Sequence, residues 1–426
     1  MAEDVKVPEG WRKIPLLEKL AFIKGKAPRK FYNFKEKNTI RYLTPECLRG
    51  RNNETLYCNI YEAEIVNDDV VVLWDGSNAG EIFFAKDGAI ASTMAKIEID
   101  EKSHKRFFYY YLKLYEPILK YQIKGSGIPH VEKDIFGLLP NTFPSLPEQH
   151  KIAEILETVD NAIEKTGRII EKYKRIKQGL MQDLLTRGIA ESDELGVRSY
   201  ELRDEKKHRF KDSPLGRIPE EWEVVEFKDI CKVRQGLQIA IANRFKEPGP
   251  KRYIYITIQY LNSNDKDEDA EYIQNPPKSV ICGKDDLLMS RTGNTGMVIT
   301  GVEGVFHNNF FLVDYDKKEV DKMYLFYYLN LPWIQEEIRA LAGSTTIPDL
   351  NHNDFYSLKF LKPPLPEQKR IASILSQIDE AIEKEQKYKE KLERIKKGLK
   401  EDLLMGKVRV NHLIEENKSL EGVENV

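Results

Sequence analysis

The sequence of 426 residues has little of what marks secreted, membrane or disulfide-stabilised proteins. Its four cysteines (Cys47, Cys58, Cys231 and Cys282) are scattered with no CxxC spacing, which indicates neither a zinc ribbon nor a disulfide framework. No stretch approaches the roughly 18 consecutive apolar residues that a membrane-spanning helix needs. The first residues lack the basic-then-apolar pattern of a secretory signal. These absences predict a cytoplasmic protein.

The chain also lacks an excess of charge of either sign. Its 67 basic and 69 acidic residues give a formal net charge of −2, so bulk charge does not indicate a nucleic-acid-binding protein. If the chain binds DNA, its basic residues must be gathered on one surface. A hydrophobic content of 41% is enough for packed cores, and the length favours two or three domains.

Sequence signatures of catalysis are missing as well. There is no GxxxxGK(S/T) loop for the phosphates of ATP, no HExxH pair for a metal and no GxSxG turn for a serine nucleophile. Residues 275–277 (Asn-Pro-Pro) resemble the start of an adenine methyltransferase motif, but Lys278 follows where that chemistry needs an aromatic ring to stack the flipped base. No glycine-rich loop suited to S-adenosylmethionine follows a strand. The sequence therefore predicts a binding protein with no catalytic residues and no metal site.

What the sequence does contain is an internal repeat. Residues 146–185 and 365–404 are identical at 23 of 40 positions, at a constant offset of 219. Earlier in each half a tryptophan precedes a glycine by 14 residues: Trp11 and Gly25, then Trp222 and Gly236. A unit of this size used twice predicts two variable domains, each followed by a well-matched helical segment.

Each repeated segment has the pattern of one long helix. A proline at its second position suits a first helical turn, and apolar residues recur at steps of three and four over nearly five heptads. Such a helix needs a partner, and we expect the two copies to pack antiparallel as a coiled coil with an internal pseudo-twofold axis. The expected interface positions are Ile152, Leu156, Val159, Ile163, Leu180, Ile371, Leu375, Ile378, Ile382 and Leu399. The alternative is that they are ordinary core helices of two domains.

The variable halves have a mixed α and β pattern. Apolar runs at 70–74, 253–256 and 310–313 predict strands, and those at 107–112 and 324–329 predict short core helices. Residues 192–214 are charged and weakly apolar, which is typical of a linker. Residues 415–426 are expected to form a frayed tail.

Candidate DNA-contacting residues gather near the repeated glycines and on two glycine-rich loops that follow strands. In the first half they are Lys24, Lys26, Arg29, Lys30, Ser77 and Asn78, and in the second half they are Arg234, Gln235, Gln238, Arg244, Arg291, Thr292 and Asn294. Arginine and glutamine can pair bidentately with guanine and adenine edges, whereas lysines more often contact phosphate. The alternative is that these charges form a solvated rim and that the loops are only turns.

These features together resemble the specificity subunit of type I restriction-modification systems. The resemblance rests on the pattern LPEQxxIAxILxxxDxAIE, which occurs twice, and on the stretches PEEW (219–222), DLLMSRTGNTG (286–296) and GSTTIP (343–348). It implies an α+β fold with two tandem mixed α/β target recognition domains, at 1–145 and 216–364. It further implies long helices at 146–188 and 365–405, a linker at 189–215 and a C-terminal tail at 406–426.

The same resemblance implies a function without catalysis in this chain. Each target recognition domain would read one half of a bipartite, asymmetric sequence in double-stranded DNA. The two helices would set the spacer and dock two modification subunits, and restriction subunits would complete the complex. No cofactor is expected in this chain, because S-adenosylmethionine, ATP and Mg²⁺ would be bound by the partner subunits. Two other interpretations stay open: a coiled-coil scaffold that binds other proteins, and a self-contained DNA methyltransferase or nuclease, which the missing motifs disfavour.

Overall fold

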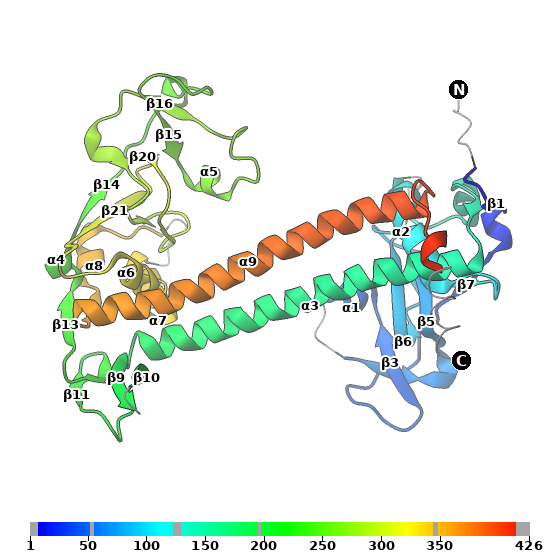
Figure 1. Cartoon of the computed structure of the whole chain (residues 1–426), viewed down its shortest axis with the longest axis horizontal. Coiled ribbons are helices and arrows are strands. Elements are labelled where there is room, and N and C mark those ends of the chain that lie inside the picture. Colours follow the sequence, from blue (N-terminus) through cyan, green and yellow to red (C-terminus); the bar gives the residue numbers. More distant parts are fainter. Residues whose placement is uncertain (1–6, 52–54, 122–128, 195–196, 344–347, 415–426) are drawn as a thin grey trace. The chain divides into compact units, whose positions relative to one another are not determined.

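The computed structural model describes residues 7–51, 55–121, 129–194, 197–343 and 348–414 (Figure 1). The chain divides into two compact units. Unit 1 comprises Met1–Gly167 and Lys387–Val426, and unit 2 comprises Arg168–Gln386. Each unit contains one mixed α and β domain, with the start of one long helix and the end of the other. The tail expected at 415–426 lies outside the described residues, as does most of the GSTTIP stretch.

Unit 1 is built on a six-stranded sheet. Its elements are β1 (Arg12–Lys13), β2 (Leu20–Lys24), β3 (Thr39–Leu43), α1 (Pro45–Leu48), β4 (Tyr57–Asn59), β5 (Glu64–Leu73), β6 (Ile82–Ile90), β7 (Met94–Ile99), α2 (Lys105–Tyr121) and β8 (Thr142–Phe143), with 3-10 turns at Leu16–Glu18, Ile60–Glu62 and Lys133–Leu138. The sheet order is β2-β7-β5-β6-β3-β4, and only β3 and β6 run parallel. Helix α2 packs on β5 and β6, so the predicted strand at 70–74 and helix at 107–112 lie in one core.

The described strands of unit 2 form two four-stranded sheets and three two-stranded sheets. Its strands are β9 (Ile189–Glu194), β10 (Val197–Leu202), β11 (Phe210–Ser213), β12 (Gly216–Pro219), β13 (Glu223–Glu226), β14 (Cys231–Gln235), β15 (Arg252–Ile256), β16 (Tyr272–Gln274), β17 (Ile281–Cys282), β18 (Leu288–Ser290), β19 (Val298–Ile299), β20 (Gly304–Phe306), β21 (Phe310–Tyr315) and β22 (Lys359–Lys362). The sheet orders are β14-β21-β18-β19 and β16-β15-β20-β17. Strands β15 and β20 are parallel, as β3 and β6 are in unit 1.

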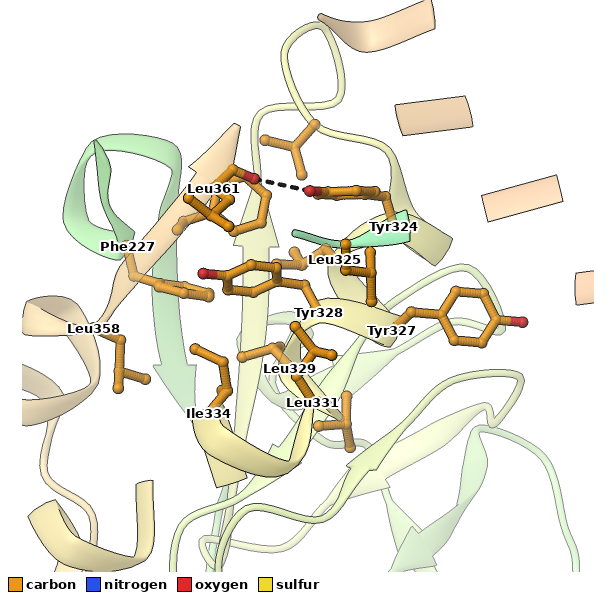
Figure 2. Close-up of a cluster of buried hydrophobic side chains, with 14 of the residues drawn as sticks. Phe227, Tyr324, Leu325, Tyr327, Tyr328, Leu329, Leu331, Ile334, Leu358 and Leu361 are labelled. Atoms are coloured by element: carbon orange, nitrogen blue, oxygen red, sulfur yellow. Dashed lines mark hydrogen bonds between the residues drawn. The ribbon is translucent and has the colours of Figure 1, made fainter. Parts of the chain in front are cut away.

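Short helices cover the sheets of unit 2. They are α4 (Phe227–Ile230), α5 (Ile258–Asn262), α6 (Lys322–Leu329), α7 (Pro332–Ala342) and α8 (His352–Ser357), with 3-10 turns at Ile241–Asn243 and Lys278–Val280. Figure 2 shows the core around α6, where Phe227, Tyr324 and Tyr328 pack among leucines. The hydroxyls of Tyr324 and Tyr328 donate to the carbonyls of Leu361 and Lys359, both at 3.0 Å. Buried tyrosines thereby connect the helix to strand β22.

The two long helices are α3 (Leu146–Leu184) and α9 (Leu365–Leu404). In unit 1, Ile152 and Leu156 at the start of α3 share one buried cluster with Leu403 and Leu404 at the end of α9. In unit 2 the relation is reversed, and the start of α9 shares a cluster with the end of α3. That cluster contains Ile371 and Leu375 together with Met181, Leu184 and Leu185. The helices therefore run antiparallel in each unit, and the predicted mixed α and β fold with two long helices is confirmed.

The expected interface positions are buried unequally. Ile152, Leu156, Ile371 and Leu375 are fully buried, and they pack into the globular core of their own unit as well as against the other helix. Leu180 and Leu399 lie partly buried at the edges of the same cores. Nearer the middle of the helices the expected positions Val159, Ile163, Ile378 and Ile382 are only half-buried. Among the expected positions, those at the helix ends, where a domain core adds to the contact, are the most buried, while Ile170 and Leu392 are buried nearer the middle.

The glutamine of each LPEQ motif connects a long helix to its domain. Gln149 donates to the carbonyl of Pro144 at 3.0 Å and accepts from the N–H of His104, where α2 begins, at 2.9 Å. Gln368 donates to Pro363 at 2.8 Å and accepts from the N–H of Asp321, where α6 begins, at 2.9 Å. Both side chains are buried, so each glutamine satisfies backbone groups that would otherwise lack partners.

The glutamate of each motif binds an arginine from the segment that follows the other helix. In unit 1, Arg409 contacts both carboxylate oxygens of the buried Glu148, at 2.6 and 2.8 Å. In unit 2, Arg203 contacts both oxygens of Glu367, which also accepts from the indole N–H of Trp222 at 3.1 Å. The repeated Leu-Pro-Glu-Gln sequence is therefore a pair of polar anchors at the start of each long helix.

The segment expected to be a linker is more ordered than its composition suggests. Strands β9 and β10 form an antiparallel hairpin, and β11 pairs with β12. Ile189 and Arg203 at the base of the first hairpin are buried, and Arg203 reaches Glu367. The segment 189–215, expected to be a linker, thus contains hairpin strands, and contacts within unit 2 anchor it through Ile189 and Arg203.

Candidate nucleic-acid interface

The two repeated glycines lie where the end of one strand crosses another backbone closely. A Cβ atom on Gly25 would lie 2.2 Å from the carbonyl oxygen of Ala91, and one on Gly236 would lie 2.2 Å from that of Phe306. No side chain fits at either position. Each glycine also donates its N–H to a neighbouring segment, Gly25 to Met94 and Gly236 to Phe310. The repeated tryptophan–glycine spacing therefore marks the point where each candidate loop leaves its sheet.

In unit 1 the chain after Gly25 forms an exposed basic loop, which we call the basic loop (residues 26–37). Its five basic side chains are all exposed: Lys26, Arg29, Lys30, Lys35 and Lys37. Only Glu36 is acidic, so the loop carries five positive charges against one negative. The ammonium of Lys30 lies 4.7 Å from the centroid of the Tyr32 ring. A loop of this charge is suited to contact with phosphate groups.

The second candidate loop of unit 1 lies beside the start of the basic loop. Ser77 and Asn78 are exposed on the tight connection between β5 and β6. The ammonium of Lys24 lies 2.8 Å from a carboxylate oxygen of Asp75, which begins this connection. The structure therefore brings together two groups of residues that are about 50 positions apart in the sequence.

Exposed hydrophobic side chains stand among these polar residues. Phe34 in the basic loop is 66% exposed, and Tyr61 is 79% exposed. Tyr61 lies next to the basic loop, because the N–H of Ile60 donates to the carbonyl of Asn38 at 3.1 Å. In unit 2, Ile241 in the loop after Gly236 is 77% exposed. These residues are not among those predicted from the sequence, although the alternation of aromatic and basic residues in RKFYNFKEK (29–37) indicates Phe34.

In unit 2 the candidate Arg244 is bound by groups of its own chain. Its guanidinium donates to the carbonyl of Ile239 at 3.0 and 2.7 Å and pairs with Glu271 at 2.9 Å. Burial opposes ionisation of Glu271, but hydrogen bonds from Arg244 and Lys246 hold the pKa of this carboxyl below its usual value. The guanidinium of Arg244, a predicted DNA contact, is therefore engaged by groups of its own loop and by Glu271.

Arg234 and Arg291 also have internal partners. Arg234 donates to the carbonyl of Ser279 at 3.0 Å. Arg291 pairs with Asp349 at 2.7 Å, and its side chain is only 16% exposed. The hydroxyl of Thr292 is buried and has no hydrogen-bond partner among the described residues. All three candidates are half-buried, and the two arginines are bound by groups of their own unit.

The amide side chains of unit 2 are the accessible part of its candidate set. Gln238 and Asn294 are exposed, and Gln235 is half-buried. Asn308 connects two of them, since its carbonyl accepts from Gln235 at 3.2 Å and its amide donates to Gln238 at 3.3 Å. Unit 2 thus offers carboxamides where unit 1 offers lysines, and carboxamides can both donate to and accept from base edges.

No group of three or more His, Cys, Asp or Glu side chains in the described part of the chain is placed to hold a metal ion. The four cysteines are free, and burial raises the pKa of the Cys231 thiol to about 12. The described helices include none that is long and apolar enough to cross a membrane.

Comparison with known proteins places both units in one family. A family model for the type I restriction modification DNA specificity domain matches residues 8–174 and again residues 219–394. The specificity subunit of the type I restriction enzyme MjaVIII from Methanocaldococcus jannaschii is 32% identical, over 96% of this chain and 95% of the relative. The EcoBI specificity subunit of Escherichia coli is 24% identical over 73% of this chain and 66% of the relative.

A solved structure shares the fold along nearly the whole chain. The type I restriction-modification S subunit from M. genitalium superimposes with a TM-score of 0.61 at 15% identity, over 95% of this chain and 98% of that one. The double match to the domain model and the identity along almost the whole length are decisive for the family. This chain, with two matches to the DNA specificity domain, belongs to the specificity subunits of type I restriction-modification systems.

Proposed function

We propose that this subunit recognises a bipartite, asymmetric sequence in double-stranded DNA, with one specified block for the domain of each unit. The observation that carries the proposal is the contrast between equal anchors and unequal loops. Glu148 and Gln149 have the same kinds of partners as Glu367 and Gln368, whereas the exposed loops of the two domains differ in charge and residue type. If two different DNA-contacting surfaces are attached to the helices in the same way, they would recognise two different half-sites.

The contact residues we propose are those that are accessible. In unit 1 they are Lys24, Lys26, Arg29, Lys30, Ser77 and Asn78, and in unit 2 they are Gln235, Gln238 and Asn294. The exposed side chains of Phe34, Tyr61 and Ile241 would add apolar contacts with sugars or base edges. Lysines would position the duplex through phosphates, and the amides would contribute to the choice of bases.

For the helices we propose two tasks, which are to fix the unspecified spacer and to dock two modification subunits. Domains that enter the same face of a duplex need half-sites about one helical turn apart, roughly 34–36 Å. Restriction subunits would complete the complex in the cytoplasm. The functional divisions are then 1–145 and 216–364 for recognition, 146–188 and 365–405 for spacing and docking, with 189–215 as a hairpin-containing connection and 406–426 as the segment after α9.

The proposal is tested by expressing the chain with its modification subunits and sequencing the methylated DNA of the host. We expect one motif that consists of two different short blocks separated by a spacer of fixed length. Replacing residues 25–140 by the first recognition domain of another family member should change one block and leave the spacer and the other block unchanged. Methylation at a single continuous motif, or a swap that alters both blocks, would refute the division into two readers.

A further inference from the structure

A tyrosine, an aspartate and a lysine from three different helices meet in unit 1. The hydroxyl of Tyr110 on α2 donates to Asp160 Oδ2 on α3 at 2.7 Å. The other oxygen of the same carboxylate, Oδ1, lies 2.5 Å from the ammonium of Lys396 on α9. One carboxylate therefore connects the domain of unit 1 to both long helices.

The same three residue types meet in unit 2, with the long helices exchanged. The hydroxyl of Tyr327 on α6 donates to Asp379 Oδ2 on α9 at 2.8 Å, and Asp379 Oδ1 lies 2.6 Å from the ammonium of Lys177 on α3. The aspartates and the lysines of the two clusters are each 219 positions apart, which is the offset of the repeat. Figure 2 shows the ring of Tyr327 turned away from Tyr324 and Tyr328, although all three are buried members of one hydrophobic cluster.

The energetic character of these clusters differs from that of the cores beside them. The lysine and aspartate side chains are between 25% and 37% exposed, and ion pairs at such exposure contribute little to the free energy of unfolding. The tyrosine hydroxyls stay protonated donors, because burial and the neighbouring carboxylate raise the pKa of Tyr110 and of Tyr327. Such a cluster instead fixes the relative orientation of the helices that carry its residues, because charge-assisted hydrogen bonds are short and geometrically specific.

The apolar contacts near these clusters do not by themselves fix the relative orientation of the helices. The nearby seam positions Val159 and Ile378 are only half-buried. A half-buried heptad seam can slide or rotate at small cost, and a polar residue in such a seam is a known way to fix its register. The aspartate does so against the opposite helix and, through the tyrosine, also against the domain.

We infer that the clusters Tyr110–Asp160–Lys396 and Tyr327–Asp379–Lys177 are positioning residues that fix the orientation of each recognition domain on the helix pair, and thereby the length of the DNA spacer. This inference rests on the proposed bipartite function. The length of the spacer and the bases specified in each block would then depend on different residues. Loss of a cluster should relax the spacer and leave both specified blocks unchanged.

The test uses the full chain in complex with its modification subunits. Methylation rates are measured on three duplexes that carry the bipartite motif found by methylation sequencing. One has the native spacer, one has a spacer longer by one base pair, and one has a spacer shorter by one base pair. The variants are Lys177→Met and Tyr327→Phe, which retain most of the packing and remove one partner of Asp379 each. Lys177→Arg retains the charge, and Lys174→Met is the matched control because Lys174 pairs with Glu171 on its own helix, at 2.9 Å.

We expect Lys177→Met and Tyr327→Phe to lower the preference for the native spacer about fivefold to tenfold, the range of the net contribution of one typical hydrogen bond. Lys177→Arg should recover most of this preference, and Lys174→Met should not change it. Equal loss of rate on all three duplexes would mean a purely structural role and would overturn the inference while the proposed function stands. If the wild-type complex methylates no bipartite motif, the proposed function fails and the inference fails with it.

Discussion

Unit 1 and unit 2 attach their long helices through equivalent side chains but present different surfaces around their glycine-bounded loops. Gln149 and Gln368 satisfy equivalent backbone groups, and Glu148 and Glu367 each bind one arginine from beyond the opposite helix. The loop after Gly25 exposes five basic side chains, whereas the candidate arginines of unit 2 are bound by the chain itself. The residues that attach a domain to the long helices are therefore equivalent in the two units, while the residues exposed on the loops differ.

The comparison also shows where the two anchors are unequal. Glu367 accepts hydrogen bonds from Trp222 and from the N–H of Ile189 in addition to Arg203. In unit 1 the indole nitrogen of the equivalent Trp11 is buried without a partner among the described residues. The carboxylate of Glu148 consequently depends more on its single arginine than that of Glu367 does.

The largest expected effect follows from this inequality. Arg409→Met leaves the carboxylate of Glu148, whose side chain is 1% exposed, without its arginine, and we expect a loss of about 3–5 kcal/mol in the stability of unit 1. Arg203→Met should cost unit 2 less, about 1–3 kcal/mol, because Glu367 keeps two neutral donors. Hydrogen exchange resolved by peptide, read separately for the two units, measures both. Lys174→Met is the control, and an equal cost in both units would contradict the inequality of the anchors.

How far the sequence predicts such features depends on the distance over which their partners act. The repeat and its heptad pattern predict α3 and α9, because helical periodicity is local. The same repeat marks Glu148 and Gln149 without explaining them, since the partner Arg409 is 261 positions away and carries no periodic signal. The hairpin of β9 and β10 is not predicted from the sequence for a related reason, because its ends are anchored by contacts with residues far away in the chain.

The candidate DNA contacts show the same limit at the level of single side chains. Residue type makes Arg244 a candidate, but only the structure shows that Glu271, 27 positions away, binds its guanidinium. Conversely, Tyr61 is an isolated tyrosine in the sequence, and its exposure beside the basic loop follows from the pairing of β3 with β4. Charge and aromatic content can be predicted from sequence, whereas accessibility depends on long-range packing.

A second prediction sharpens the contrast between free lysines and bound arginines. Lys26→Ala and Lys30→Ala should each lower the slope of log affinity against log salt concentration by about 1, because each removes one phosphate contact of the kind that releases a counterion. Neither change should alter the melting temperature. Arg244→Ala should do the reverse, lowering stability by roughly 1–3 kcal/mol with no change in the salt slope, because Glu271 loses one of its two partners and the carbonyl of Ile239 loses its donor. Fluorescence anisotropy with a short duplex between 50 and 300 mM salt, paired with thermal melts, distinguishes the two classes.

The outcome that would contradict this contrast is a change of salt slope in Arg244→Ala equal to that in the lysine variants. In that case the guanidinium would leave Glu271 when DNA binds. Lys174→Met again serves as a control, since its ammonium is paired within α3 and lies outside both candidate loops.

The smallest expected effect concerns the residue at which the first helix of each core begins. His104 and Asp321 occupy equivalent places, since each donates its N–H to the glutamine of an LPEQ motif. Asp321 also caps α6 by accepting from two backbone N–H groups, both at 3.0 Å. In unit 1, burial, the neighbouring ring of His150 and the charge of Arg106 lower the pKa of His104 to about 4.

Unit 1 should therefore be more sensitive to mild acid at this position than unit 2. A histidine with a folded pKa near 4 stays neutral in the folded state, whereas the unfolded chain takes up a proton below pH 6.5. The stabilisation is thus complete above pH 6.5 and is lost as the pH falls toward 4, with on the order of 1–2 kcal/mol lost between pH 7 and pH 5. His104→Asp should remove this component, and at neutral pH it should add about 1 kcal/mol by capping α2 as Asp321 caps α6. Urea unfolding of the two proteins at pH 7 and pH 5 measures the difference. An unchanged pH dependence in His104→Asp would show that titratable groups other than His104 account for the acid sensitivity of unit 1.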